Sequence, residues 1–130
     1  MSTIFEKIIR GEIPCHKIRE DDRYLAFLDV RPMRPGHTLV IPKRAVDYLF
    51  DLDDDVLGGI LLFARPIARA IQAAVPCRRV GIMVAGLEVP HAHVHLVPIA
   101  NVHDLNFANA QPAPSEELAQ LAAKIRASFV

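Results

Sequence analysis

Three histidines occupy alternate positions in the stretch HAHVHLVPI, at His91, His93 and His95. On a β-strand the three imidazoles would share one face, because successive side chains of a strand point to opposite faces. Three neutral imidazoles on one face could hold a zinc ion with an open fourth position. One of them could instead act as a nucleophile or a general acid, since imidazole titrates near neutral pH. A purely structural face of histidines is the least favoured interpretation, because three imidazoles would need many separate partners.

The segments around the histidines predict the elements that position them. Apolar residues recur at helical spacing over 54–74, which predicts a long core helix capped by Asp53 or Asp54. Short connections favour antiparallel pairing of the predicted strands, since a parallel crossover needs a dozen or more residues. We therefore expect an α+β fold, a mainly antiparallel five-stranded sheet with one long helix packed on it. The strands are expected at 16–20, 23–30, 37–42, 79–86 and 91–99, a short helix at 4–10, and a last helix, capped by Ser115, at 116–128.

Length, charge and cysteine content bound the class of protein. The 130 residues predict a single domain over 1–130, in which 100–130 forms a C-terminal extension with a helix. Fifteen basic and fifteen acidic residues give no net charge, which argues against binding to a nucleic-acid backbone. Two cysteines form no disulfide framework, and neither a signal peptide nor a span of about 20 apolar residues is evident. We expect a cytoplasmic protein with no membrane partner.

Several motifs in order resemble the histidine triad family of nucleotide hydrolases and transferases. These are TIFEKIIRGEIP, EDDRYLAFLDVRPMRPGHTLVIPK and AGLEVPHAHVHLVPI, and the pattern looks most like the compact nucleotide-binding branch. The resemblance implies hydrolysis at an α-phosphate through a covalent nucleotidyl-histidine, releasing a nucleoside monophosphate. It suggests a purine nucleoside phosphoramidate-type substrate and needs no cofactor. His95 at the third triad position favours hydrolysis, because the transferase branch usually has glutamine there.

The resemblance also implies a role for individual residues. His93 would be the nucleophile, oriented by the main-chain carbonyl of His91, while His95 would contact the phosphate and assist the leaving group. His37 would support His91 from a neighbouring strand, and Asp29 would accept hydrogen bonds from the ribose. The remaining nucleotide-binding candidates are the base-pocket residues Phe5, Ile8, Phe27, Leu28 and Val30, and Gly86 and Glu88 near the phosphate and leaving group.

Three positions depart from the family pattern and keep other functions open. Leu87, Val80 and Glu88 stand where the family often has glutamine, a phosphate-contacting amide and a small hydroxyl residue. The alternatives are therefore a dinucleoside polyphosphate hydrolase and a nucleotide-binding module with vestigial catalysis. A zinc protein is the third alternative. Thr3 and Glu6 occupy the positions where metal-binding relatives carry a cysteine pair, so we expect no metal.

The predicted edge strand also bears on assembly. The run RVGIMVAG has few features that would protect a sheet edge, and the long helix carries apolar residues beyond one stripe, such as Leu62 and Phe63. Compact members of the family that the chain resembles are two-fold dimers. We therefore expect a homodimer in which the strand near 80–86 and the helix near 57–71 meet their copies. The alternative is a monomer in which residues 115–130 cover these surfaces.

Overall fold

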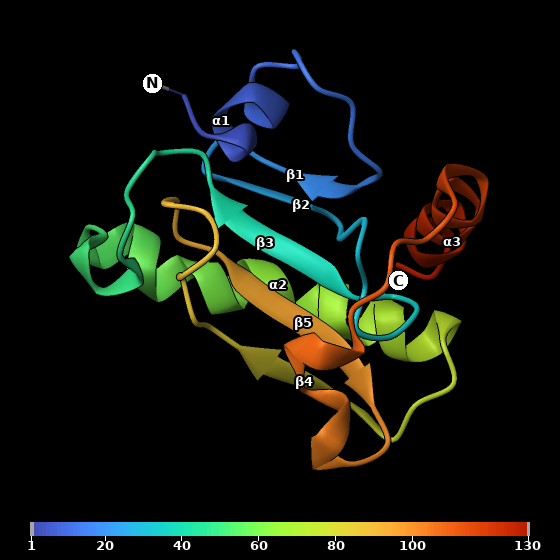
Figure 1. Cartoon of the computed structure of the whole chain (residues 1–130). Helices are drawn as coiled ribbons and strands as arrows, with labels where there is room; N and C mark the ends of the chain where they lie inside the picture. Colours follow the sequence, from blue (N-terminus) through green and yellow to red (C-terminus); the bar gives the residue numbers. More distant parts are fainter. Residues whose placement is uncertain (1, 130) are drawn as a thin grey trace.

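Five antiparallel strands form one sheet in the computed structural model, which describes residues 2–129 (Figure 1). The strand order is β1-β2-β3-β5-β4, so β1 and β4 form the two edges. This arrangement confirms the predicted α+β class with an antiparallel sheet. The strands are β1 Lys17–Glu20, β2 Tyr24–Leu28, β3 Thr38–Pro42, β4 Arg79–Met83 and β5 Val94–Ile99. The α-helices are α1 Ile4–Ile9, α2 Asp54–Ala74 and α3 Ser115–Ala127, with short 3-10 helices η1 Leu49–Asp51, η2 Val102–Asp104 and η3 Phe107–Asn109.

The helix bounds agree closely with the predicted ones, but two predicted caps do not form. Thr3 and Glu6 make a reciprocal capping box that begins α1. Asp53 precedes α2 without bonding to its amides, because its carboxylate instead pairs with Arg44. Ser115 is the first residue of α3, and Pro114 occupies the capping position. Proline suits a helix start because its fixed φ and missing N–H cost nothing there.

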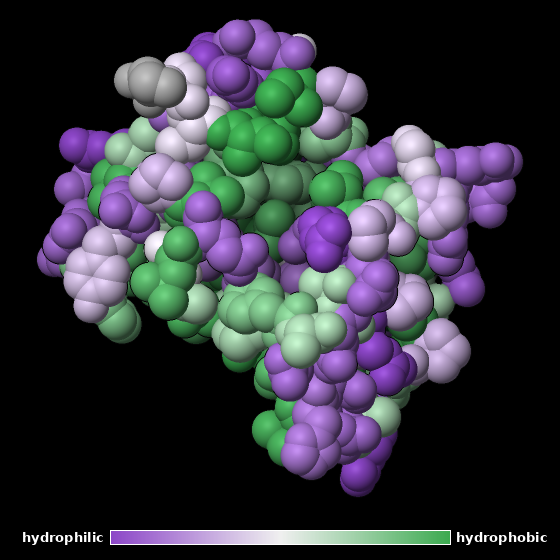
Figure 2. Space-filling view, in the orientation of Figure 1, coloured by the Kyte–Doolittle hydropathy of each residue, from purple (hydrophilic) through white to green (hydrophobic). Residues whose placement is uncertain are grey.

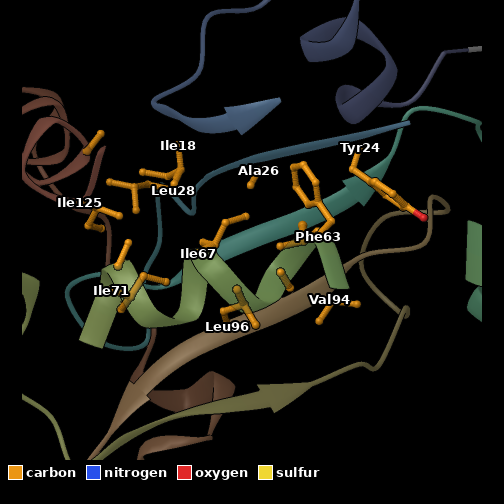
Figure 3. Close-up of a cluster of buried hydrophobic side chains, with 14 of the residues drawn as sticks. Ile18, Tyr24, Ala26, Leu28, Phe63, Ile67, Ile71, Val94, Leu96 and Ile125 are labelled. Atoms are coloured by element: carbon orange, nitrogen blue, oxygen red, sulfur yellow. The ribbon is translucent and has the colours of Figure 1, made fainter. Parts of the chain in front are cut away.

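The sheet separates two apolar layers of different function. On one face, alternate residues of β2, β3 and β5 pack against α2, as Figure 3 shows for Ala26, Leu28, Val94 and Leu96 beside Ile67 and Ile71. On the other face, a smaller cluster joins α1 to the sheet. Because strand side chains alternate, the same strands supply both layers. This second cluster comprises Phe5, Leu25, Phe27, Leu39 and Ile41.

Helix α2 is the main core element. By length and composition alone it is apolar enough to cross a membrane, which the sequence analysis did not anticipate. The core helix of a folded domain passes the same test, and α2 packs one apolar stripe on the sheet. That stripe is buried and consists of Ile60, Phe63, Ala64, Ile67, Ala70, Ile71 and Ala74.

The C-terminal helix α3 packs at the β1 side of the molecule, away from the β4 edge (Figure 1). Its buried residues Leu118, Ala122 and Ile125 join the core cluster that contains Ile18 of β1. Arg126 donates a hydrogen bond to the carbonyl of Lys17, which fixes this helix to β1. The described part of residues 115–130 therefore packs on α2 and β1 and not along β4, so it covers part of only one of the two surfaces named in the monomer alternative.

Two adjacent glycines of α2 provide a matched test of packing. A Cβ at Gly59 would lie 2.5 Å from the hydroxyl oxygen of Tyr24, which donates a hydrogen bond to the carbonyl of Val56 over 2.7 Å. We expect Gly59→Ala to break this buried contact and to lower the free energy of unfolding by about 1–3 kcal/mol. A Cβ at Gly58 meets nothing within 4 Å, so Gly58→Ala should stabilise the helix by up to about 1 kcal/mol. Urea unfolding of both variants measures the difference, and equal effects would contradict the packing described here.

Candidate active site

The triad residues do not share one strand. Strand β5 begins at Val94, so of the three histidines only His95 lies within it, while His91 and His93 belong to the preceding loop. The alternation nevertheless continues far enough to place His93 and His95 on the face opposite α2, where their rings lie 5.0 Å apart. All three side chains are buried, with exposed fractions of 3% or less. Burial of three imidazoles requires specific hydrogen-bond partners.

Backbone carbonyls set the tautomers of His91 and His93. A carbonyl only accepts, so Nδ1–H of His93 donates to the carbonyl of His91 over 2.7 Å. Nε2 of His93 then carries the lone pair, as a nucleophile requires. In the same way, Nε2–H of His91 donates to the carbonyl of Pro42 over 2.7 Å. The expected orientation of His93 by the His91 carbonyl is thus present in the structure.

A backbone amide sets the tautomers of the second pair. The N–H of Met33 donates to Nδ1 of His37 over 3.0 Å, so the proton of neutral His37 resides on Nε2. This Nε2–H donates to Nδ1 of His95 over 2.9 Å. The proton of His95 therefore resides on its Nε2, which is buried without a hydrogen-bond partner among residues 2–129. His95 therefore presents an N–H donor without a partner among residues 2–129, on the ring beside that of His93.

This geometry corrects the expected role of His37. The family resemblance implied that His37 supports His91, but the His37 ring contacts His95 instead. The reason is the register, which places His95 opposite Leu39 on β3, close to His37 just before that strand. Gly36, with a φ of 101°, makes the turn that delivers His37, and a side chain there would press on Val75 and Pro98.

Burial keeps these imidazoles neutral. Desolvation lowers the pKa of His37 from 6.5 to about 4. Desolvation first, and then the neighbouring His37 and His93, lower the pKa of His95 from 6.5 to about 3. The pKa of His91 is also lowered by desolvation, against the opposing effect of its bond to Pro42. Near neutral pH all three rings are uncharged, so the tautomers described above are the relevant ones.

The hydrogen bonds do not suit a metal ion. One ligand atom each of Asp29, His37 and His95 lies within 4.8 Å of the others, which is close enough to share an ion. A metal on Nε2 of His37 would require the proton to move to Nδ1, where the amide of Met33 already donates. Nε2 of His91 and Nδ1 of His93 donate to separate carbonyls, which leaves one accepting nitrogen on each of these rings. The group of Asp29, His37 and His95 therefore does not fit zinc, and no step is assigned to a metal.

The aromatic residues of the predicted base pocket lie beside the triad. The Phe5 ring lies 5.2 Å from that of His93 and 5.8 Å from that of Phe27, and Ile8 packs on the same cluster. Leu28 is an exception and a correction. It faces α2 on the opposite side of the sheet, because side chains alternate along β2. Val30 lies beyond the strand and is 59% exposed.

Asp29 contacts the histidine pair directly. One of its oxygens accepts the N–H of Arg31 over 2.9 Å, and the other lies 3.7 Å from Nε2 of His37. Burial raises the pKa of this carboxyl, although the bond from Arg31 opposes the effect. Nε2–H of His37 donates to His95 and not to this second oxygen, so the oxygen is available for the predicted ribose contact.

Two cavities flank the histidines. The first, of about 400 Å³, is lined by His93 and Ala92 together with residues 47–50 and 84–87. Gly86, whose φ is 76°, lines this first cavity. The second, of about 250 Å³, is lined by Asp29, Arg31, His37, Glu88, Phe107 and Ala110. Figure 2 shows apolar side chains gathered around the hollow on the front of the molecule, with polar groups beside them.

Sequence reasoning missed several of these participants. The amide of Met33 and the carbonyl of Pro42 are backbone groups, so no residue pattern marks them. Phe107 contacts the His95 ring at 5.3 Å from the C-terminal extension, where it is an aromatic residue within a stretch dominated by loop-forming residues. This isolated aromatic residue was the one feature of the sequence that could have indicated a contact between the extension and the triad.

Comparison with known proteins agrees with this geometry. The HIT domain family model matches residues 10–102. The chain belongs to the HIT family. The HIT chain is 36% identical over 106 residues to adenosine 5'-monophosphoramidase hnt1 of Schizosaccharomyces pombe, covering 78% of this chain and 77% of that one.

Solved HIT structures resemble this one over nearly the whole chain. A Hit-like protein of Bartonella henselae involved in cell-cycle regulation gives a TM-score of 0.87 at 36% identity, covering 98% of this chain and 96% of that chain. A zinc-bound histidine triad protein of Mycobacterium smegmatis gives 0.84 at 32% identity, covering 99% of this chain and 94% of that chain. The similarity therefore extends past the matched domain into the C-terminal extension.

Proposed function

We propose that this HIT protein hydrolyses purine nucleoside phosphoramidates at the α-phosphate through a covalent nucleotide on His93. One observation carries the proposal. The Nδ1–H bond from His93 to the His91 carbonyl leaves a lone pair on Nε2, on a residue at the base of an open cavity. The similarity to the S. pombe monophosphoramidase supports the substrate class.

The reaction proceeds in two displacements. Nε2 of His93 attacks the α-phosphorus, the P–N bond of the substrate breaks, and the leaving amine takes a proton. The neutral His95 ring donates a hydrogen bond from its Nε2–H to a phosphate oxygen, and the departing amine takes its proton from water. Water then attacks the nucleotidyl-histidine, the bond between phosphorus and Nε2 breaks, and the nucleoside monophosphate leaves.

The proposed substrate-binding residues lie in the apolar cluster and in the two cavities beside the triad. The base lies against Phe5, Ile8 and Phe27, the ribose beside Asp29, and the phosphate close to the amides near Gly86. Glu88 lines the smaller cavity with Asp29, at the site of the departing group. The exposed side chain of Val30 borders the nucleotide site. Leu28 does not contact the nucleotide, because it faces α2 on the other side of the sheet.

Comparison of substrates tests this function. We expect kcat/KM for adenosine 5'-phosphoramidate to exceed that for a diadenosine polyphosphate by at least about 100-fold, or about 2.7 kcal/mol of transition-state stabilisation. Glu88 favours the smaller, less anionic substrate, because a polyphosphate would bring negative charge towards its carboxylate. The reverse preference would favour the polyphosphate hydrolase, and tight nucleotide binding without turnover would favour a binding module.

We further propose that the protein is a homodimer formed by β4 and α2. Strand β4 is an edge of the sheet, and α3, which packs on α2 and β1, leaves that edge uncovered. Large apolar side chains of α2 and of the β4 segment are exposed, namely Leu61 53%, Leu62 61%, Ile82 51% and Val84 41%. An exposed apolar patch next to an open edge is typical of a protein interface.

A cytoplasmic location remains a prediction from the reduced cysteines Cys15 and Cys77.

Sedimentation equilibrium tests the dimer. We expect a mass of about twice 14.4 kDa at micromolar concentration. A double variant, Leu62→Lys with Ile82→Lys, should sediment as a monomer, because it buries charge in the contact. Ile4→Lys, which changes a similarly exposed apolar residue on α1, should remain dimeric. A wild-type mass near 14 kDa would refute the dimer.

A further inference from the structure

The C-terminal extension returns across the active site. After β5, residues 101–113 pass from η2 and η3 back to the loop between β2 and β3. Asp104 pairs with Arg34 at 3.1 Å, and the amides of Gln111 and Ala113 donate to the carbonyls of Pro32 and Val30 over 3.3 and 3.1 Å. These contacts hold the segment at the end of the site where Asp29 and His37 lie.

Phe107 is the side chain of this segment that reaches the triad. Its ring meets the ring of His95 edge-on, with centroids 5.3 Å apart and planes at 77°. Asn106 caps the short helix η3 by accepting the N–H of Ala108 over 2.9 Å, which fixes the position of Phe107. His95 is only 3% exposed, while Phe107 is 38% exposed. Phe107 therefore lies between the histidine and solvent.

We propose that Phe107 is a positioning residue that excludes water from His95 and holds its imidazole neutral, with Nε2–H directed to the substrate. The role of this N–H towards the substrate rests on the proposed function. The neutral protonation state of the His95 ring does not depend on that function. The HIT domain match ends at residue 102, so this cover comes from the extension beyond the matched domain.

Exclusion of water matters because the hydrogen-bond chain tolerates no extra proton. A second proton on His95 would occupy Nδ1, which accepts from Nε2–H of His37. Two N–H groups would then face each other, and the ring would have to turn away. His37 cannot reverse its own tautomer, since its Nδ1 accepts from the amide of Met33. Only a neutral His95 therefore keeps its donor in place.

The charged groups around His95 make the cover necessary. The Asp29 carboxylate lies 3.7 Å from His37, and Glu88 lines the same cavity, so both would favour a protonated imidazole once water entered. Arg31 lines this cavity as well and opposes them. The remaining titratable neighbours are His93 and His37, which lower the pKa of His95. Without the Phe107 ring, the carboxylates of Asp29 and Glu88 would favour a protonated His95, and only the guanidinium of Arg31 would oppose them.

Proton NMR of the histidine rings in the ligand-free protein tests the proposal directly. In the wild type we expect His95 to stay neutral down to about pH 4. In Phe107→Ala its pKa should rise by at least about one pH unit, a tenfold change in its protonation equilibrium. Phe107→Leu, which restores an apolar cover, should return the pKa towards the wild-type value. Val102→Ala, a control on the same segment with a side chain 71% exposed, should titrate as the wild type does.

A second measurement follows activity on adenosine 5'-phosphoramidate against pH. The ratio of kcat/KM at pH 5 to that at pH 7.5 should fall at least about threefold further in Phe107→Ala than in the wild type, and recover in Phe107→Leu. An unchanged titration of His95 in Phe107→Ala would overturn the proposal, as would failure of the leucine variant to restore it. If no phosphoramidate is hydrolysed, the proposed function fails, while the NMR titration still decides the role of Phe107.

Discussion

His93→Ala is expected to abolish turnover while the fold and nucleotide binding persist. Removal of the imidazole deletes the proposed nucleophilic atom, and the corresponding Nε2 atoms of the two neighbouring triad rings carry protons. Nε2–H of His91 is bound to the carbonyl of Pro42, and Nε2 of His95 carries a proton rather than a lone pair. We expect kcat to fall by at least about 10³-fold. Single-turnover kinetics and calorimetric binding of adenosine monophosphate measure the two effects separately.

The matched control is His103→Ala, which removes an exposed imidazole outside the site. This variant should keep the wild-type rate, since the N–H that bonds to Asn101 belongs to its backbone. Mass spectrometry of acid-free quenched wild-type protein should detect a nucleotide on the peptide containing His93. Near-wild-type turnover by His93→Ala would refute the assignment of the nucleophile.

Acid should destabilise the protein in a defined pH range. The folded-state pKa values of His37 and His95, about 4 and about 3, lie below their ordinary value of 6.5. Between those values the unfolded chain binds protons that the folded chain refuses, so the free energy of unfolding falls as pH decreases. The full contribution is present above pH 6.5 and is lost progressively towards pH 4. We expect a loss of about 3 kcal/mol for each of the two histidines, partly offset by Asp29, whose raised pKa acts in the opposite sense.

Urea unfolding at pH 7, 6, 5 and 4 measures this dependence. In His37→Gln the amide can accept from Met33 and donate to His95, yet it does not titrate, so the slope with pH should decrease. His103→Gln removes an exposed histidine and should keep the wild-type slope. A free energy of unfolding that stays constant from pH 7 to pH 4 would contradict the neutral buried pair.

Periodicity predicted most of the fold because the sheet and α2 are amphipathic. The apolar spacing over 54–74 located α2 to the residue, and alternation predicted that His93 and His95 share a face, which in the structure lies opposite that helix. The prediction that Leu28 lines the base pocket was wrong. All five residues of β2 are buried, and its sequence does not alternate between apolar and polar residues, so the sequence did not show which side chains face the pocket and which face α2. The predicted caps at Asp53 and Ser115 failed because competing local contacts decide them.

The connections within the site were harder to predict. Residue identity suggested that His37 acts with the triad, but its partner depends on strand register, which places His95 rather than His91 beside it. Phe107 lies 12 residues after His95 and reaches it only because the extension folds back. Contacts that depend on tertiary folding of this kind leave no periodic signal.

The main-chain groups that hold the imidazoles have a consequence for protein engineering. Met33, Pro42 and His91 act through an amide and two carbonyls, so substitution of their side chains leaves the protonation pattern of the site in place. The same three histidines grafted onto a strand of another scaffold would lack these groups and would populate mixed tautomers. The backbone conformation of this protein therefore sets the tautomers of its histidines. A designer would have to transfer the backbone segments around Met33 and Pro42 together with the histidine motif.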